Sequence, residues 1–489
     1  MPLPFAGHFQ GGHISPILAA SEEDGLRVID VRHEVNAVFA ADAVARLTGV
    51  PGVAAVTAGP GVTNTITAVK NAEMAQVPLV LLGGAAATIM KGRGSLQDIN
   101  QRDVLSPIVK KCFTVNTVRD IVPMMREAFQ VAQSGVPGPV FVELPLDVLY
   151  CPLDIMVEMG WFERTRANRV VAPAELKRVV VPQEFRVTQR RKEDATREAY
   201  LKSLRPEATV FLRPSKPNPN PWYVRGYLSA SLNYLHGNSP VVDEMLQRTD
   251  SGGSGSISKA PIDFSPLPVH IPLPSAGDVE SAAKFLAKAK RPCLVLGSQV
   301  TISANLMDQL AAAIDRLGMP TFLGGMARGL LGAHGRCYIK QGRTNALAQS
   351  DCVILAGSVA DFRMAYGRAL PKGVPVIAVN RSSEMLSLNT DLYWKPTLAS
   401  QSDACLFLLA LADAVRRAGG PGLGAQDEGW LAGLKAAEAV KERANARMAE
   451  EPAYGTGTRA GQRLINPLAL FKEMERTLPE KSILVADGG

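Results

Sequence analysis

Short apolar runs that alternate with helical patterns constrain this fold more than any other feature of the chain. Each run is followed by a turn and then by residues with helical spacing, as in the amphipathic segment near 118–134. Apolar strands at this spacing predict a parallel sheet that helices cover on both faces. In the first 150 residues the runs are RVIDV (27–31), VAAVT (53–57), PLVLLGG (78–84) and PVFVELP (139–145).

The same alternation resumes at about residue 276 and predicts a second domain of similar size. Helices are expected at 277–290 and 303–317. The predicted fold class is therefore α/β, with tandem parallel-sheet, three-layer domains. The apolar runs of this second part are 292–298, 320–325, 351–358 and 375–381.

The chain after the second domain has a different composition. Residues 428–450 are rich in Ala, Glu and Lys and predict a helix, as does NPLALFKEMERTL at 466–478. The last apolar run, SILVA at 482–486, predicts a strand.

Residues 152–275 follow neither pattern. RPSKPNPNPW (213–222) and SGGSGS (251–256) are typical of linkers, and only 222–235 has the apolar spacing of a helix. A connection of this length inside a compact unit marks a domain boundary with an insertion. We therefore predict domains at 1–151, 152–275 (insertion or linker), 276–420, 421–465 (helical linker) and 466–489.

Composition excludes several classes of protein. With 46% apolar and 20% charged residues, the chain resembles an ordinary soluble α/β protein. Most of the net charge of +7 comes from 163–213, where 13 Lys and Arg face 7 Asp and Glu, and no nucleic-acid-binding signature accompanies it. The longest uncharged stretch, 47–69, contains Pro and Gly and is a poor membrane helix. The six scattered cysteines indicate reduced thiols, not a zinc site or a disulfide framework.

Three segments that follow predicted strands are candidates for a site. Glu34 begins a helix, where a first-turn carboxylate can simply be stabilised by the helix dipole. AGPGVTN (58–64) is either an ordinary strand-to-helix turn or a close backbone approach to a ligand, and GSLQDINQRD (94–103) is either a solvated loop or a site loop. All three follow strands of one parallel sheet, whose carboxyl edge is where α/β domains bind ligands.

These motifs and their order carry a resemblance. RHEVNAVFAADAVARLTG, AVTAGPGVTNTITAVKNAEMAQVPLVLLGG and GPVFVELPLDV resemble the N-terminal pyrimidine-binding domain of thiamine-diphosphate-dependent enzymes. The most similar group contains acetolactate synthase, oxalyl-CoA decarboxylase and 2-hydroxyacyl-CoA lyase, and within it the animal acetolactate-synthase-like branch. Residues from about 276 to 420 resemble the central domain of this group, with FLGGMARGLLG and SDCVILAGSVADFRMAYGR (350–368) as the most similar stretches.

The resemblance implies roles for five residues. Glu34 matches the catalytic glutamate, whose carboxylate hydrogen-bonds the aminopyrimidine of thiamine diphosphate and favours the tautomer that activates the thiazolium carbon. Gln97 matches a glutamine that faces the reacting carbon. Pro60 and Asn64 match positions that line the pyrimidine site, and Gly12 matches a backbone contact.

The chain also departs from this group. Its members bind Mg²⁺ through a GDG…N motif in a third domain, of which ADGG (486–489) matches only the opening strand, so the Mg²⁺ ligands are missing from this sequence. At the other end, the resemblance predicts that the first helix and strand are missing. We therefore expect a chain cut short at its C-terminus that does not hold thiamine diphosphate productively by itself.

The activity implied by the resemblance is cleavage of a 2-hydroxyacyl-CoA to a shortened aldehyde and formyl-CoA, as in fatty acid alpha-oxidation. Acetolactate-type carboligation of 2-oxo acids and a non-catalytic partner or fragment that pairs with full-length subunits are the alternatives. The resemblance also implies a homodimer or tetramer and the endoplasmic reticulum membrane, although the sequence has no membrane span. The resemblance is compatible with either FAD or ADP in the central domain, and no residue of the sequence distinguishes between these two nucleotides.

Overall fold

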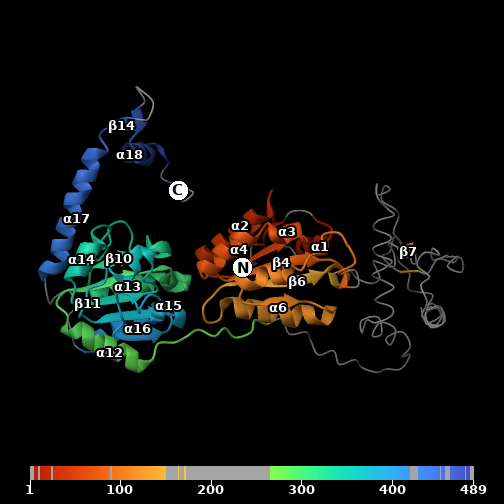
Figure 1. Ribbon diagram of the computed structural model, residues 1–489, viewed down its shortest axis with the longest axis horizontal. Helices are drawn as coiled ribbons and strands as arrows, with labels where there is room; N and C mark the ends of the chain where they lie inside the picture. The colour runs from red at the N-terminus through yellow and green to blue at the C-terminus, as the bar shows by residue number, and fades with distance from the viewer. Residues whose placement is uncertain are drawn as a thin grey trace. The chain divides into compact units, whose positions relative to one another are not determined.

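The computed structural model describes the chain in two compact units, Met1–His270 and Ile271–Gly489, each built around its own parallel sheet (Figure 1). This confirms the predicted fold class. The described residues are 5–8, 11–23, 26–88, 91–149, 163–164, 170–171, 265–418, 428–451, 453–456, 463–479 and 481–484.

The first unit contains a six-stranded sheet in the order β2-β1-β3-β4-β6-β5, and every neighbouring pair is parallel. Its three central strands β3, β4 and β6 are buried along their whole length, as expected for strands covered on both faces. The strands are β1 (Phe5–His8), β2 (Val28–Asp30), β3 (Gly52–Val56), β4 (Leu79–Ala85), β5 (Cys112–Thr114) and β6 (Pro139–Pro145).

Two apolar layers enclose this sheet because successive strand residues point to opposite faces. Ala54 and Val56 of β3 pack with α2 and α4, whereas Val53 and Ala55 pack with α1 and α6. Figure 1 shows α6 on the opposite side of the sheet from α2. The helices of this unit are α1 (Ser15–Glu23), α2 (Glu34–Thr48), α3 (Pro60–Thr63), α4 (Ile66–Met74), α5 (Gln101–Leu105), the 3₁₀ turn η2 (Ser106–Ile108), α6 (Val118–Gln133) and α7 (Leu146–Leu149).

The sequence-based expectation that the first strand is missing was wrong. β1 precedes Gly11 and pairs in parallel with β2 on one side and with β3 on the other. Its four residues, FAGH, are too few to show a period and contain a glycine, so no pattern predicted the strand. The three-residue strand β5 at the sheet edge was missed for the same reason.

The second unit has a five-stranded parallel sheet in the order β10-β9-β11-β12-β13. Helices α12, α13 and α16 pack on one face, while α14, α15 and Trp430 of α17 pack on the other. Its elements are β9 (Pro292–Leu296), β10 (Thr321–Leu323), β11 (Cys352–Ala356), β12 (Val376–Asn380), β13 (Leu398–Gln401), α12 (Ala276–Lys288), α13 (Met307–Leu317), α14 (Arg343–Gln349), α15 (Ser383–Ser387), α16 (Ala404–Arg417), α17 (Glu428–Met448) and α18 (Pro467–Thr477), with 3₁₀ turns η5 (Ser298–Thr301), η6 (Ala304–Leu306), η7 (Gly325–Ala327) and η8 (Phe362–Gly367).

The expected final strand at 482–486 is wrong over its described part. Residues 482–484 form no ladder, because a strand forms only where a neighbour accepts its backbone hydrogen bonds and no described strand pairs with them. The helix expected at 222–235 lies outside the described residues. Two short antiparallel pairs complete the described elements, β7 (Glu163–Arg164) with β8 (Val170–Val171), and β14 (Ala453–Thr456) with β15 (Arg463–Ile465).

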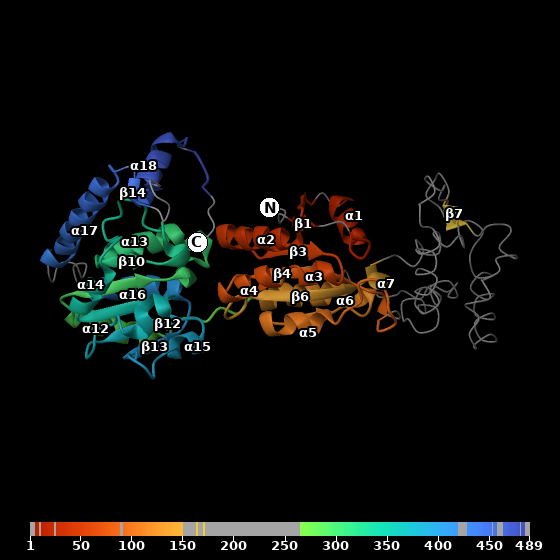
Figure 2. The same ribbon diagram turned by 45° about the horizontal axis from the view of Figure 1, so that its top comes forward.

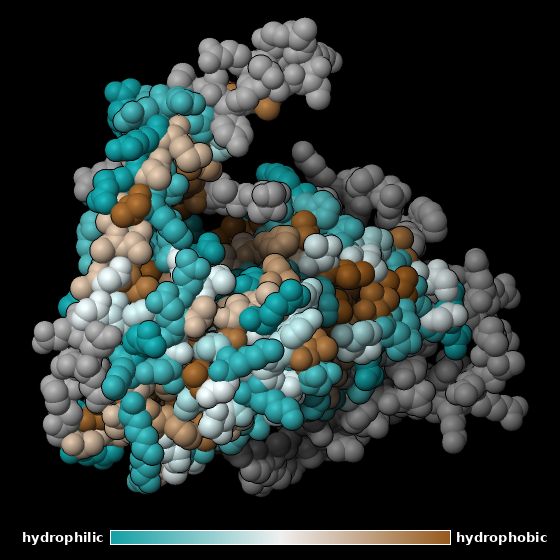
Figure 3. Space-filling model, turned by 60° about the vertical axis from the view of Figure 1, so that its left-hand side comes forward, coloured by the Kyte–Doolittle hydropathy of each residue, from teal (hydrophilic) through white to brown (hydrophobic). Residues whose placement is uncertain are grey.

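On the face drawn in Figure 3, hydrophilic residues are interspersed with patches of apolar residues. In α18, none of whose described side chains is buried, Leu470 and Phe471 are exposed. No helix among the described residues combines the length and the apolar composition that crossing a bilayer requires.

Candidate functional site

The candidate residues follow strands that meet at the reversal point of the first sheet. The chain runs from β1 outward to β2 and then returns to β3 on the other side, so the order reverses between β1 and β3 (Figure 2). Crevices at such points, outside the carboxyl ends of the strands, are where open α/β sheets bind ligands. Gly12 follows β1, Glu34 follows β2 and Pro60 follows β3.

Glu34 is the first residue of α2 and is buried, with 7% of its surface exposed. The preceding His33 caps the helix, because its Nδ1 accepts a hydrogen bond from the Val35 N–H at 3.2 Å. The Asn64 Nδ2 donates to Glu34 Oε2 at 3.0 Å. Within the described residues, this amide is the only hydrogen-bond donor to the carboxylate, so the other oxygen keeps its capacity to accept a ligand proton.

Asn64 and Pro60 lie at the two ends of the short helix α3. The Asn64 N–H donates to the Pro60 carbonyl at 2.9 Å, while the Asn64 side chain reaches α2. Both residues are exposed. One asparagine therefore joins the turn after β3 to the carboxylate after β2.

The turn before α3 needs a glycine at position 59. Gly59 has φ +60° and ψ −110°, a conformation that residues with a Cβ rarely adopt. A Cβ here would also lie 2.6 Å from the backbone oxygen of Gln97. The loop that carries Gln97 is therefore pressed directly against this turn.

Gln97 has a positive φ of 60°, which is uncommon for a residue other than glycine. Its side chain is hydrogen-bonded to His13, a buried residue next to Gly12. Burial lowers the pKa of His13, and the Gln97 hydrogen bond opposes that shift. Strained backbone of this kind persists where its surroundings determine it fully, and it concentrates at functional sites.

Thr57, at the end of β3, completes the wall between Glu34 and the residues after β1. Its Oγ1 is buried and has no hydrogen-bond partner among the residues that the structure describes. A Cβ at Gly11 would lie 2.1 Å from this oxygen, and a Cβ at Gly61 would lie 2.7 Å from Thr57 Cγ2 and 3.8 Å from Glu34 Oε1. The predicted contact residue Gly12 is different, since nothing lies within 4 Å of the position its Cβ would take.

The structure thus brings Glu34 and Asn64 together by a hydrogen bond and packs Gln97 against the turn before Pro60. It gives Gly12 no such contact. Sequence reasoning missed three buried polar residues of this region, His13, Thr57 and Gln101. The available signal was their position in the sequence. His13 and Thr57 lie directly beside glycine-containing turns, and Gln101 lies within the 94–103 segment.

A metal site is not formed in the described ranges, where no three His, Cys, Asp or Glu side chains come together in a suitable arrangement. The chemistry of the site is instead that of a buried carboxylate, an amide, an unpartnered hydroxyl and closely approaching backbone. These groups suit a flat, hydrogen-bonding ring that offers a donor to Glu34.

Comparison with known protein families identifies two domains in the chain. Residues 8–104 match the N-terminal TPP binding domain of thiamine pyrophosphate enzymes, and residues 279–411 match the central domain of the same enzymes. The two matches fall in the two structural units respectively.

Individual relatives cover nearly the whole chain. The 2-hydroxyacyl-CoA lyase 2 of Danio rerio is 41% identical over 479 residues, which are 98% of this chain and 64% of that protein. The Homo sapiens protein of the same name is 41% identical, over 98% of this chain and 62% of its own length. A probable acetolactate synthase of Mycobacterium bovis is 24% identical over 98% of this chain and 65% of its length. The chain thus spans just under two thirds of these relatives.

Proposed function

The chain belongs, through its N-terminal and central domains, to the thiamine pyrophosphate enzymes. We propose that it supplies the pyrimidine-binding half of a lyase site that cleaves 2-hydroxyacyl-CoA to a shortened aldehyde and formyl-CoA, and that it does not complete this reaction by itself. Relatives that are 41% identical carry the name 2-hydroxyacyl-CoA lyase 2, which supports this reaction over others of the family. The chain spans less than two thirds of the length of those proteins, so their activity is a proposal for this chain.

The observation that carries the proposal is the buried carboxylate of Glu34 with one of its oxygens free of hydrogen bonds from the described chain. The chemistry supplied by thiamine diphosphate, when bound, is a nucleophilic carbon able to break the bond beside a carbonyl group. Glu34 would hold the proton that it shares with a ring nitrogen of the aminopyrimidine. In a water-poor pocket, such a shared proton is held strongly.

Neighbouring residues would orient that carboxylate and line the pyrimidine end of the cofactor. Asn64 holds Oε2 of Glu34, and the glycines at 11 and 61 let the backbone pack closely against Thr57. The unpartnered Thr57 hydroxyl offers an additional donor in the same wall. Gln97, whose loop is packed on the Gly59 turn, would face the reacting carbon. The described residues fit the pyrimidine end, and no metal-binding group among them serves the diphosphate.

Product analysis tests the proposal. We would incubate the protein with thiamine diphosphate, Mg²⁺ and a 2-hydroxyacyl-CoA, and measure the aldehyde. We expect no aldehyde from the chain alone. When the chain is mixed with a full-length relative whose matching glutamate is replaced by glutamine, we expect aldehyde release that Glu34→Gln abolishes. Glu384→Gln should leave this release unchanged, since Glu384 is an exposed first-turn carboxylate in the other unit. Equal aldehyde release by Glu34→Gln and the wild type would overturn the assigned role.

Two other outcomes correspond to the alternatives. Acetolactate formation from pyruvate, without aldehyde from the CoA ester, would replace the lyase by a carboligase. Release of neither product would overturn the lyase proposal for this chain, and co-purification with a full-length relative would then identify a non-catalytic partner.

A nucleotide in the second unit remains a prediction. Arg343 is partly buried, and its pKa is lowered chiefly by burial, with Asp361 opposing and with Arg328 and Arg363 adding to the shift. The charge of this group is partly neutralised, because Asp361 is hydrogen-bonded to Arg363 and raises the pKa of Arg363. Equilibrium dialysis with FAD and with ADP would measure whether either binds there.

A further inference from the structure

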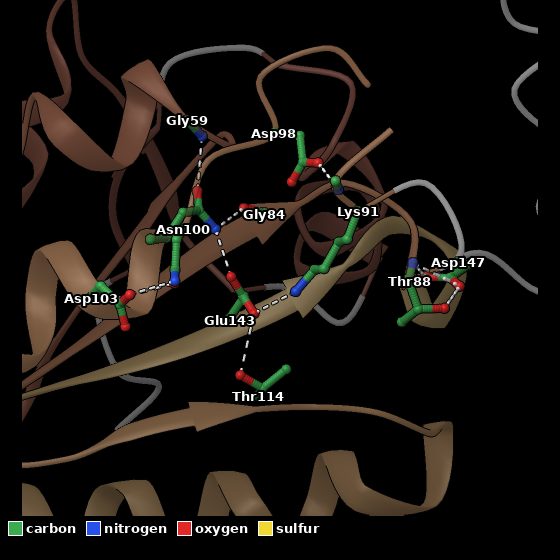
Figure 4. Close-up of polar contacts among 12 residues, drawn as sticks. Gly59, Gly84, Thr88, Lys91, Asp98, Asn100, Asp103, Thr114, Glu143 and Asp147 are labelled. Carbon is green, nitrogen blue, oxygen red and sulfur yellow. Dashed lines mark hydrogen bonds and ion pairs between the residues drawn. The ribbon is translucent and has the colours of Figure 1, made fainter. Parts of the chain in front are cut away.

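A buried charged network lies behind the site and is not used by the proposed chemistry. Its centre is Glu143 on β6, which is 3% exposed. The carboxylate accepts hydrogen bonds from Lys91 Nζ at 2.7 Å, Gln101 Nε2 at 3.1 Å and Thr114 Oγ1 at 3.2 Å. Figure 4 shows Lys91 and Thr114 converging on Glu143 from different sides.

Gln101 connects this carboxylate to the turn that precedes α3. Its Oε1 accepts from the Gly59 N–H at 2.8 Å, and its Nε2 donates to the Gly84 carbonyl at 3.1 Å as well as to Glu143. One side chain thus joins the turn after β3 to residues near the carboxyl ends of β4 and β6. Only an amide can accept on one side and donate twice on the other, so glutamate would not serve here.

Lys91 connects the same carboxylate to the loop 91–100. The loop is closed on itself by Asp98, whose Oδ2 accepts from the Gly92 N–H at 2.6 Å. It carries Gln97, whose backbone is strained and whose carbonyl lies against Gly59. The Lys91 side chain remains about one-third exposed, whereas that of Glu143 is almost fully buried.

We propose that Glu143 is a positioning residue for the cofactor site. Glu143 holds the Gly59 turn through Gln101, and it holds the loop of Gln97 through Lys91. The turn and the loop therefore keep a fixed position relative to each other. A buried ion pair adds little stability compared with apolar packing of the same volume, and a role in selecting one arrangement accounts for its presence here. That the turn and the loop form walls of a thiamine diphosphate site rests on the proposed function.

Amide hydrogen exchange of the full chain without cofactor tests the positioning itself. In Lys91→Met we expect peptides from 91–100 and 58–64 to exchange at least 10-fold faster, while peptides from β4 keep their rates. Lys91→Arg should restore the protection, because it keeps the charge and the donor. Lys70→Met is the matched control, since it breaks the exposed ion pair with Glu73 in the same unit.

Gln101→Met should release the Gly59 amide selectively, and this variant tests the second connection independently of the first. Faster exchange across the whole unit in Lys91→Met, or no change in either segment, would overturn the proposal. Uniform acceleration would mean that the ion pair stabilises the domain as a whole and does not place the two segments.

Calorimetric titration with thiamine diphosphate and Mg²⁺ separates this inference from the function on which it rests. If the wild type binds the cofactor, Lys91→Met should bind at least 10-fold more weakly, with recovery in Lys91→Arg. Equal affinity of Lys91→Met and the wild type would overturn the positioning role. If the wild type does not bind, as expected for a chain without the Mg²⁺ ligands, the exchange result by itself decides the positioning role, and the aldehyde assay with the full-length relative decides the proposed function.

Discussion

Replacing Gly59 by alanine should destabilise the first unit and loosen the loop of Gln97. Two separate costs arise at this position. The backbone conformation, φ +60° and ψ −110°, is strained for any residue with a Cβ, at about 1–3 kcal/mol. The added methyl group would also lie 2.6 Å from the Gln97 carbonyl oxygen and 3.0 Å from the Gln97 Cβ.

The contact cost follows from how far the neighbour must move. The atom met is backbone, so the loop itself must shift by roughly half an ångström or more to reach van der Waals distance, and overpacking of this kind costs about 1–3 kcal/mol. Together the two costs give a loss of about 3 kcal/mol, with the larger values applying if the loop cannot yield.

Gly92→Ala is the matched control. Gly92 also has a positive φ, +73°, but nothing lies within 4 Å of the position of its Cβ. It should therefore lose only the conformational part, about 1 kcal/mol. The difference between the two variants contains the contact between the turn and the loop, together with any extra strain of the Gly59 backbone.

The assay is hydrogen exchange of the slowest amides of β4, which reports the unfolding free energy of the first unit, with those of β11 as a reference for the second. Gly59→Ala should lower the unfolding free energy of the first unit by about 2 kcal/mol more than Gly92→Ala does. Equal losses in both variants would refute the reasoning that Gln97 is packed on the turn. A loss in β11 as well would show that the effect is not local.

Three further outcomes are expected. Glu34→Gln should change the unfolding free energy, measured by denaturant unfolding, by no more than about 1 kcal/mol, since it removes a first-turn charge but keeps an acceptor for Asn64. The same variant should lose thiamine diphosphate binding, which titration calorimetry measures. Burial lowers the pKa of His13 from 6.5, so the unfolded chain binds the proton more readily than the folded chain. The contribution of His13 to stability is therefore full above about pH 6.5 and falls as the pH drops below that value. His13→Gln should reduce this loss of stability between about pH 7 and about pH 5, as measured in thermal melts. Arg381→Leu leaves the almost fully buried Asp403 carboxylate without its cation and should cost the second unit about 3–5 kcal/mol in denaturant unfolding.

The long central strands could be predicted from the sequence because burial on both faces leaves a continuous apolar run. The run PVFVELP coincides with β6 residue for residue. The strands β1, β5 and β13 gave no such signal, because their residues, FAGH, CFT and LASQ, form no continuous apolar run. The apolar run at 482–486 shows the converse, because an apolar pattern without a pairing partner forms no strand.

The site could be predicted in part. The order of strands placed Glu34 and the 58–64 turn at one sheet edge, and family resemblance supplied their suggested chemistry. The connection from Gln101 to Gly59 spans 42 residues of sequence, and no local pattern predicts it. The burial of His13 is likewise not indicated by any local pattern around this single histidine.

The close fit around Thr57 has an evolutionary consequence. A methyl group at Gly11 or Gly61 would collide with Thr57, so this wall of the site is backbone that cannot acquire a side chain. Gly92 and Gly94, in contrast, have open space where a Cβ would be. Divergence of substrate preference among related chains is therefore expected to accumulate in the loop 91–100, while the wall beside Glu34 stays invariant.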